Sequence, residues 1–268
     1  MAAADFSGRT VLAVFAHPDD ESLACGGTLA RLSDAGARVV LLCASYGRRG
    51  WVSDPALVPD GDLGRARAAE LHEAARVLGV AEVIMRDHPD GDLRWADVPE
   101  LHAEIVAAIR DYGVDAVITF AEDGLYWHLD HIGVHERTMT AVRSLGDAAP
   151  SLYYVTMPKG VMHGIVEAAV AGGWSRPSSG FWSIVPNAFG IVARRPSFIV
   201  DVTPWVPRKV AALLCHQTQV GASDPFGRIN QADAQRLLGS EQFRRARPHS
   251  GCALLEPLGE PLIKRRRS

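Results

Sequence analysis

The sequence predicts an α/β protein with a doubly wound, mostly parallel sheet and helices on both faces. The first observation behind this prediction is an alternation of short apolar runs with longer amphipathic segments, which is typical of βαβ units. The second is a composition close to that of ordinary soluble proteins, with 47% hydrophobic and 22% charged residues. The third is a clustering of His and Asp just after two of the apolar runs. In Rossmann-like sheets ligands bind at this carboxyl edge, so we expect the active site there.

In the first half of the chain, strand and helix patterns follow each other in order. Continuous apolar runs that are too short for helices predict strands at Thr10–Phe15, Arg38–Cys43, Glu82–Met85 and Val114–Phe120. Apolar residues at helical spacing predict helices at Gly26–Ala35, Gly64–Leu78, Val98–Arg110 and Leu129–Leu145. Gly79 marks the end of the second helix, because glycine is a usual residue just past a helix end.

The second half of the chain has a less regular pattern. Two strands and a helix are expected, at Leu152–Thr156, Ser197–Val200 and Pro207–Gln219. Between the strands, residues 172–187 are rich in Gly, Ser and Pro but contain Trp174, Phe181 and Trp182. Such a loop either packs on the surface or forms a wall or lid over a pocket, and the sequence leaves both interpretations open. Because no linker divides the chain, we expect a single domain over residues 1–268.

Charge and hydropathy exclude several classes of protein. The chain of 268 residues has 31 acidic and 28 basic side chains, and a net charge of −3 does not favour nucleic acid as a partner. No apolar run reaches about 18 residues, so no membrane span is expected. The first residues lack the pattern of a signal peptide, and the four cysteines are scattered without a C-x-x-C pair. We therefore expect a cytoplasmic protein.

Two short motifs carry the residue types of a metal-dependent active site. Residues 16–22, after the first expected strand, are A-H-P-D-D-E-S, and residues 126–131, after the fourth, are Y-W-H-L-D-H. Two histidines and one carboxylate with an open fourth position form a catalytic Zn²⁺ site. A further carboxylate takes a proton from water in such sites, and a further imidazole stabilises an oxyanion. Each motif alone is also compatible with a turn that caps the next helix, but both occur at the same edge of the expected sheet.

With these motifs the chain resembles the LmbE-like (PIG-L) zinc-dependent de-N-acetylases, roughly from residue 11 to residue 219. The resemblance implies a zinc site formed by His17, Asp20 and His131. It also implies that Asp19 is a general base that later protonates the amine, and that His128 stabilises the oxyanion as imidazolium. It implies further that Asp130 orients His128 and that Tyr126 assists at the oxyanion.

The resemblance also suggests contacts with the substrate. Arg67 and Asp90 match substrate-binding positions, although Arg67 and Glu70 are equally compatible with an ion pair on an exposed helix face. The family usually has Gly and Pro beside the first histidine of the second motif, where this chain has Trp127 and Leu129. The indole of Trp127 would narrow the pocket, stack on a sugar or pack inward.

Three further observations come from histidines and glycines elsewhere in the chain. Lys209 and the H-Q-T-Q segment at 216–219 match a late family signature, which we interpret as structural. His135 lies four residues after His131, but without the Glu of an H-E-x-x-H motif it is not expected to bind metal. His88 is near Asp90 in the sequence, which leaves open whether it approaches the pocket. No G-x-G-x-x-G is present, so a dinucleotide is not expected.

These residues lead to a hypothesis about the reaction. The chain is expected to remove the acetyl group from a small N-acetylglucosamine-type amino-sugar conjugate, with one Zn²⁺ per chain and Fe²⁺ or Co²⁺ as alternatives. The metal site would lie within about 9–145, and the substrate pocket and lid within about 150–255. Two alternatives stay open, an amidase of the same family that cleaves a larger amide of the mycothiol S-conjugate type, and a non-catalytic sugar-conjugate binding protein. The sequence leaves open the aglycone and whether the chain forms a homo-oligomer.

Overall fold

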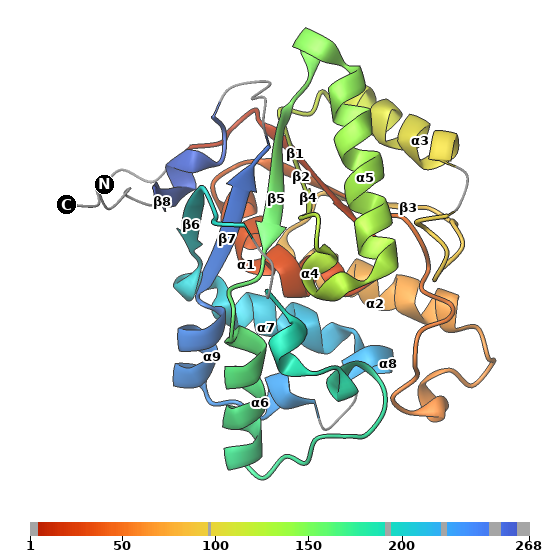
Figure 1. Ribbon diagram of the computed structural model, residues 1–268, viewed down its shortest axis with the longest axis vertical. Helices are drawn as coiled ribbons and strands as arrows, with labels where there is room; N and C mark the ends of the chain where they lie inside the picture. Colours follow the sequence, from red (N-terminus) through yellow and green to blue (C-terminus); the bar gives the residue numbers. More distant parts are fainter. Residues whose placement is uncertain (1–4, 96–97, 191–193, 221–223, 247–252, 262–268) are drawn as a thin grey trace.

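The computed structural model describes residues 5–95, 98–190, 194–220, 224–246 and 253–261, and its centre is one sheet (Figure 1). The strands of this eight-stranded sheet are β1 Thr10–Phe15, β2 Arg38–Cys43, β3 Glu82–Met85, β4 Ala116–Phe120, β5 Ser151–Thr156, β6 Phe198–Asp201, β7 Ser240–Arg245 and β8 Gly259–Pro261. Their spatial order is β3-β2-β1-β4-β5-β7-β6-β8. The first five strands in this order pair in parallel, and the last three pair antiparallel. The predicted doubly wound, mostly parallel sheet is therefore confirmed.

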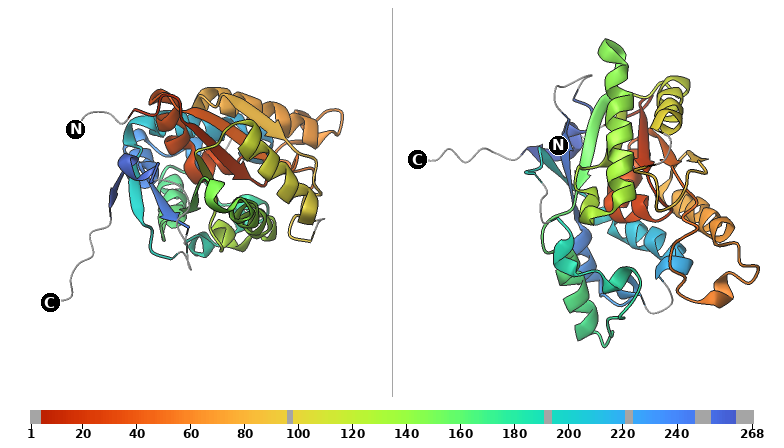
Figure 2. Two further views of the ribbon diagram at one scale, coloured as in Figure 1. Left: turned by 90° about the horizontal axis from the view of Figure 1, so that it is seen from above. Right: turned by 45° about the vertical axis from the view of Figure 1, so that its right-hand side comes forward.

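Helices cover both faces of this sheet (Figure 2). Their bounds are α1 Asp20–Asp34, α2 Leu63–Leu78, α3 Val98–Asp111, α4 Gly124–Trp127, α5 Leu129–Ser144, α6 Val161–Ala171, α7 Val206–Cys215, α8 Gln217–Val220 and α9 Gln231–Leu238. Helices α1, α2 and α7 pack together, and α3 packs against α5 on the opposite face. Strands β1 and β4 are completely buried between these two layers. Among the helices that the structure describes, none has the length and apolarity needed to span a membrane.

The parallel order fixes where the two motifs lie. Strand β1 pairs with β4, with Val11 opposite Ala116 and Ala13 opposite Ile118. Because both strands run in the same direction, the segments that follow Phe15 and Phe120 leave the sheet side by side. The fold thus brings together two motifs that are more than a hundred residues apart in the chain, as expected for ligand sites in sheets of this type.

Two helices differ from the sequence prediction at their ends. Helix α1 begins at Asp20 and not at Gly26, and a non-helical residue, Cys25, bends it close to the predicted start. The prediction failed there because the polar first turn, with buried Asp20 and Glu21, does not look like a core-facing helix. The expected helix Pro207–Gln219 is interrupted at His216, where the backbone leaves the helical region between α7 and α8.

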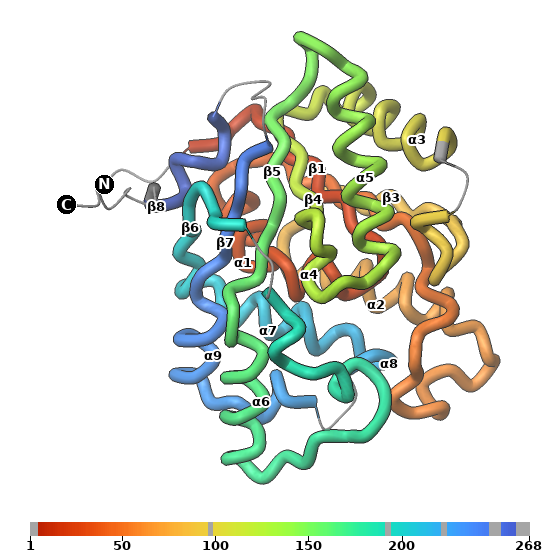
Figure 3. The backbone as a smooth tube through the Cα atoms, in the orientation of Figure 1, coloured from red at the N-terminus to blue at the C-terminus, as the bar shows by residue number. Residues whose placement is uncertain are grey.

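Elements of the second half of the chain were harder to predict. Helices α6 and α9 and strands β7 and β8 were not expected. Strand β7 reads S-E-Q-F-R-R and buries Glu241 and Phe243 on one face. A charged residue in a buried position hides the period-two pattern of a strand. The loops 44–62 and 172–190 extend from the same end of the molecule (Figure 3), and the ring of Trp51 lies beside Gly180.

Candidate active site

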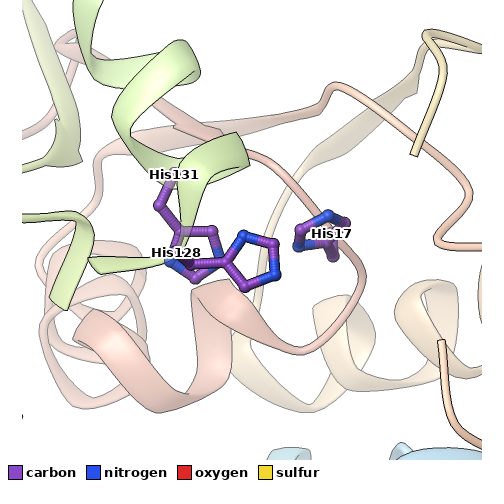
Figure 4. Close-up of side chains that lie close together, drawn as sticks. All are labelled: His17, His128 and His131. Carbon is purple, nitrogen blue, oxygen red and sulfur yellow. The ribbon is translucent and has the colours of Figure 1, made fainter. Parts of the chain in front are cut away.

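The two motifs converge on a buried cluster of imidazoles beyond the carboxyl ends of β1 and β4 (Figure 4). His17 follows β1, His128 precedes α5, and His131 lies in the first turn of α5. One ring nitrogen of each lies within 4.8 Å of the other two. His17 and His131 are 7% and 1% exposed. Buried imidazoles at such distances either share protons or face a cation, and the hydrogen bonds of each ring decide between these arrangements.

The ring of His131 presents a lone pair toward Asp20. Its Nδ1–H donates to the carbonyl oxygen of Gly124 over 3.1 Å, which leaves Nε2 unprotonated in the neutral ring. This buried Nε2 has no hydrogen-bond partner in the structure, although it lies 3.1 Å from Oδ1 of Asp20. The face of the ring stacks on Phe120 at 4.1 Å, which fixes its orientation.

His17 is held in a complementary way. Its Nε2–H faces Oδ2 of Asp130 at 3.0 Å and Oδ1 of Asp90 at 3.1 Å. Its Nδ1 is therefore free to face Oδ2 of Asp20, 3.5 Å away. Burial alone would raise the pKa of Asp20, but His131 and His17 hold it well below its usual range. Burial alone would lower the pKa of His17, but its hydrogen bonds with Asp130, Asp20 and Asp90 raise it well above its usual value, so a protonated His17 is one cation that Asp20 can face.

These atoms fit a divalent cation. Without protons on Nδ1 of His17 and Nε2 of His131, two lone pairs would face the Asp20 carboxylate, and two His and one carboxylate are the ligands of catalytic zinc sites. A second group of close ligand atoms, His17, Asp90 and Asp130, fits less well. Asp130 already accepts the N–H groups of Gly91 and Leu93 at 2.7 and 2.9 Å, and its lone pairs are used there.

Asp130 does not have the role expected from the resemblance. Its carboxylate contacts His17, and only its backbone N–H reaches His128, where it donates to Nδ1 over 3.2 Å. The expectation that Asp130 orients His128 through its side chain is therefore wrong. The carboxylate points away from His128 because the backbone N–H groups of the 91–93 loop hold it against His17.

The pKa of His128 bears on its expected protonation. Burial, together with the neighbouring His131 and His17, lowers the pKa of His128 to about 4. This direction opposes the expected imidazolium, which stays a prediction. Because its Nδ1 accepts the N–H of Asp130, the single proton of the neutral ring lies on Nε2. Tyr126 stands edge-on to this ring at 5.7 Å, and burial raises the pKa of Tyr126 well above its usual value.

Asp19 has a strained backbone and a raised pKa. Its φ of 118° is unfavourable for a residue with a side chain and costs about 1–3 kcal/mol. Leu125 and Trp127 are the other non-glycine residues with positive φ in the described part of the chain, so this strain is concentrated at the site. Burial raises the pKa of Asp19 to about 6, although the charge of Arg67 opposes the shift.

Arg67 lies inside the site and not on an exposed face. It is 4% exposed, and its guanidinium donates to the carbonyl oxygens of Gly47 and Pro18 and to Oδ2 of Asp19, the last over 3.1 Å. Glu70 accepts instead from Thr218, at 2.7 Å from both its N–H and its hydroxyl. The alternative of an exposed Arg67–Glu70 pair is therefore wrong, because other segments of the chain cover this face of α2.

A cavity of about 260 Å³ opens beside these residues. It is lined by the sequence-predicted residues His17, Asp19, Asp20, Arg67, Asp90, Tyr126 and His128. His131 lies just behind them, completely buried. Trp127 is not among the lining residues and is 51% exposed, so the structure gives no support to its predicted contact with the substrate. Its positive φ separates its side chain from those of its neighbours Tyr126 and His128.

The cavity also has walls that the sequence did not indicate. These residues are Leu23, Arg49, Leu213, Gln219, Val220 and Phe226. The first-half residue Arg49 donates its N–H to Asp90 over 2.6 Å. In loop 172–187, Trp174 and Trp182 are 7% exposed, and Phe181 lines the cavity. This loop is thus a packed wall of the cavity in the structure. Its aromatic residues were the feature of the sequence that could have indicated this packing.

His135, His88 and Lys209 have partners away from the cavity. His135 lies against the carbonyl oxygen of Phe120 at 2.9 Å, and His88 contacts Glu104 at 2.7 Å. The side chain of Lys209 forms a buried ion pair with Glu241 at 2.6 Å.

Comparison with known proteins places this geometry in a family. A family model described as PIG-L, GlcNAc-PI de-N-acetylase, matches residues 12–142. The 1D-myo-inositol 2-acetamido-2-deoxy-alpha-D-glucopyranoside deacetylase of Geodermatophilus obscurus is 32% identical over 277 residues, which cover 91% of this chain and 94% of that relative. The resemblance seen in the two motifs is therefore confirmed over most of the chain.

Solved structures share the fold at lower identity. The N,N'-diacetylchitobiose deacetylase of Pyrococcus horikoshii matches with a TM-score of 0.62 at 21% identity, over 89% of this chain and 84% of that one. The 4-carboxy-2-hydroxymuconate hydratase of Pseudomonas putida matches with a TM-score of 0.60 at 20% identity, over 92% and 99%. Because a hydratase shares this fold, the reaction has to be argued from the site.

Proposed function

The chain belongs to the GlcNAc-PI de-N-acetylase (PIG-L, LmbE-like) family, and on this premise we propose that it hydrolyses the acetamide of a small N-acetylglucosamine conjugate. One observation carries the proposal. Asp19, with a pKa raised to about 6, contacts Arg67 and adjoins Asp20, whose carboxylate faces His17 and His131. A carboxylate with a pKa near the working pH is suited to accept a proton and to return it.

The cofactor in this proposal is Zn²⁺, with Fe²⁺ or Co²⁺ as alternatives. His17 through Nδ1, Asp20 through its carboxylate and His131 through Nε2 would hold it. When bound, the ion supplies a positive charge that acidifies water and polarises the amide carbonyl. The hydrogen bonds of His17 to Asp130 and of His131 to Gly124 fix both rings in the tautomers that metal binding needs.

The proton transfers belong to Asp19. In the first step its carboxylate takes a proton from the attacking water, and in the second it gives this proton to the leaving amine, so that acetate and the free amino sugar are released. Arg67 keeps Asp19 ionised between turnovers because its charge lowers the pKa that burial raises.

Two groups are suited to the charge that develops on the carbonyl oxygen. In the neutral form that its lowered pKa favours, His128 keeps its proton on Nε2 and donates a hydrogen bond from there. Tyr126 keeps its O–H proton because burial raises its pKa.

Asp90 is suited to contact the sugar. Burial raises its pKa, but His17 outweighs this effect and lowers the pKa of Asp90 to about 2, so its carboxylate is ionised. An ionised carboxylate accepts hydrogen bonds from sugar hydroxyls.

The proposal is tested by acetate release from a panel of N-acetylglucosaminides with metal-quantified protein. Asp19→Ala should keep the metal and lose about 10²–10⁴ of kcat, the usual contribution of a general acid–base group. Glu73→Ala is the control, since Glu73 is an exposed acid that pairs with Arg76. Release of a larger acyl group in place of acetate would favour the amidase alternative. Metal binding without any hydrolysis would favour the sugar-conjugate binder.

A further inference from the structure

The strained backbone of Asp19 is held by a buried chain of hydrogen bonds that no step of the proposed reaction uses. Its N–H donates to Oε2 of Glu21 over 3.0 Å. The other oxygen of Glu21, Oε1, lies 2.9 Å from Nε2 of His216. We infer that Glu21 and His216 are positioning residues for Asp19, an inference that rests on the proposed function. They would keep the Asp19 carboxylate aimed at the reacting water while its backbone holds an unfavourable conformation.

The carboxylate of Glu21 is fully engaged. It is 0% exposed and accepts from the N–H of Asp19, the hydroxyl of Ser22 at 2.5 Å and the ring of His216. Each donor constrains a different direction, so the carboxylate cannot rotate without losing a buried hydrogen bond. The N–H of Asp19 therefore has a fixed acceptor, and this is the group that holds φ of Asp19 at 118°.

His216 is anchored from the opposite side. It lies at the junction of α7 and α8 and is also 0% exposed. Two residues further on, Thr218 is held by Glu70 of α2 through its N–H and its hydroxyl. Helix α2 also supplies Arg67, which holds the carboxylate of Asp19. The same helix thus supports Asp19 twice, once directly through the side chain and once through the chain of His216 and Glu21.

These residues act on the reaction without touching it. Neither Glu21 nor His216 is among the residues that line the cavity. A second buried pair offers a comparison, because Lys209 and Glu241 also connect α7 to α1. Glu241 accepts from the N–H groups of Gly27 and Thr28, a full two turns of helix away from Asp19. Loss of that pair should weaken the fold but leave Asp19 in place.

The test compares three variants with this control. His216→Met removes the donor to Glu21, His216→Gln keeps an N–H near Nε2, and Glu21→Gln leaves one of its donors without an acceptor. Lys209→Met breaks the other buried pair. For each variant kcat and KM are measured per folded chain, with metal content and the midpoint of thermal unfolding.

The inference expects His216→Met and Glu21→Gln to lose about 10²-fold in kcat, the scale of a misplacement near 1 Å, with KM and metal content close to those of the unchanged chain. His216→Gln should recover a large part of this loss. Lys209→Met should lower the unfolding midpoint and keep kcat. The inference is overturned if kcat stays the same, if KM rises instead, or if kcat falls only in step with metal content or folded fraction.

A crystal structure of Glu21→Gln gives a readout that does not depend on turnover. The inference expects the φ of Asp19 to leave the positive region or its carboxylate to turn away from Arg67. An unchanged backbone and carboxylate position of Asp19 would contradict the inference. This structure therefore tests the inference even if His216→Met fails to fold. If the unchanged chain hydrolyses no N-acetylglucosaminide, the proposed function fails, whereas the geometry of Asp19 in this variant still tests the positioning chain.

Discussion

The parallel part of the sheet and its antiparallel edge contribute to the site in different ways. Segments after β1 and β4 supply the imidazoles and carboxylates proposed for metal binding and proton transfer, in two short motifs between the strand ends and the first turns of the next long helices. The region that includes β7, β6 and helices α6 to α9 supplies Phe181 and Phe226 as walls, and His216 as a buried support. Reactive groups are thus local in the sequence, whereas their supports come from distant parts of it.

This contrast follows from the geometry of parallel strands. Adjacent parallel strands end at the same edge, so short loops after them meet without further structure. A residue that holds such a loop from the side opposite the cavity lies outside the sheet, and therefore comes from a helix that packs over it. The contact between His216 and Glu21, for example, joins residues separated by 195 positions.

The strongest test of the reactive region is His131→Ala. Without Nε2 of His131 the metal should be lost, and activity should fall by more than about 10²-fold, since even residues behind metal ligands contribute up to that much. Metal content and acetate release are measured together. His135→Ala is the control on the same helix, because His135 contacts a backbone oxygen of Phe120 and the ring of Tyr154 and should keep the metal. A metal-free, active His131→Ala chain would refute the ligand assignment.

In the region of β6, β7 and helices α6 to α9, the variant to compare with His131→Ala is Lys209→Met. It leaves Glu241 buried without its cation, and should lower the free energy of unfolding by about 3–5 kcal/mol, as measured by denaturant titration. Arg76→Met, which removes an exposed ion pair with Glu73, should leave it nearly unchanged. A loss of kcat in the folded fraction of Lys209→Met would break the distinction between reactive and supporting regions.

The pH profile of Arg67→Met tests the role of Asp19 as the general base. Asp19 must be deprotonated to accept a proton, so kcat/KM rises with pH through its pKa. Arg67 lowers this pKa. Its removal should raise the pKa of Asp19 and move the acid limb of the profile to higher pH. Arg65→Met, an exposed change on the same helix, should leave the limb in place, and a limb that moves to lower pH in Arg67→Met would contradict the assignment.

The smallest effect is expected for Trp127→Ala. The side chain is half exposed and outside the cavity lining, so kcat/KM should stay within about twofold, the scale of ordinary surface substitutions. Phe181→Ala, which opens a wall of the cavity, should raise KM by a larger factor. A tenfold loss in Trp127→Ala would restore the sugar-stacking interpretation.

Sequence patterns predicted the first half of the fold closely. Strands Thr10–Phe15, Arg38–Cys43 and Glu82–Met85 occur with the expected bounds. The first two runs are almost entirely buried, so their apolar pattern is continuous and easy to read. Strand β7 was missed because Glu241, paired with Lys209, occupies a core position that a sequence pattern assigns to an apolar residue.

The sequence by itself determined the fold class, the two motifs and the residue types proposed for the metal, because each of these depends on residues close together in the chain. Only the tertiary structure decided the partners of those residues. It placed the carboxylate of Asp130 against His17, buried Arg67 against Asp19, and lowered the pKa of His128. A hydrogen bond or a pKa depends on what other segments place within a few ångströms, and no local pattern contains that information.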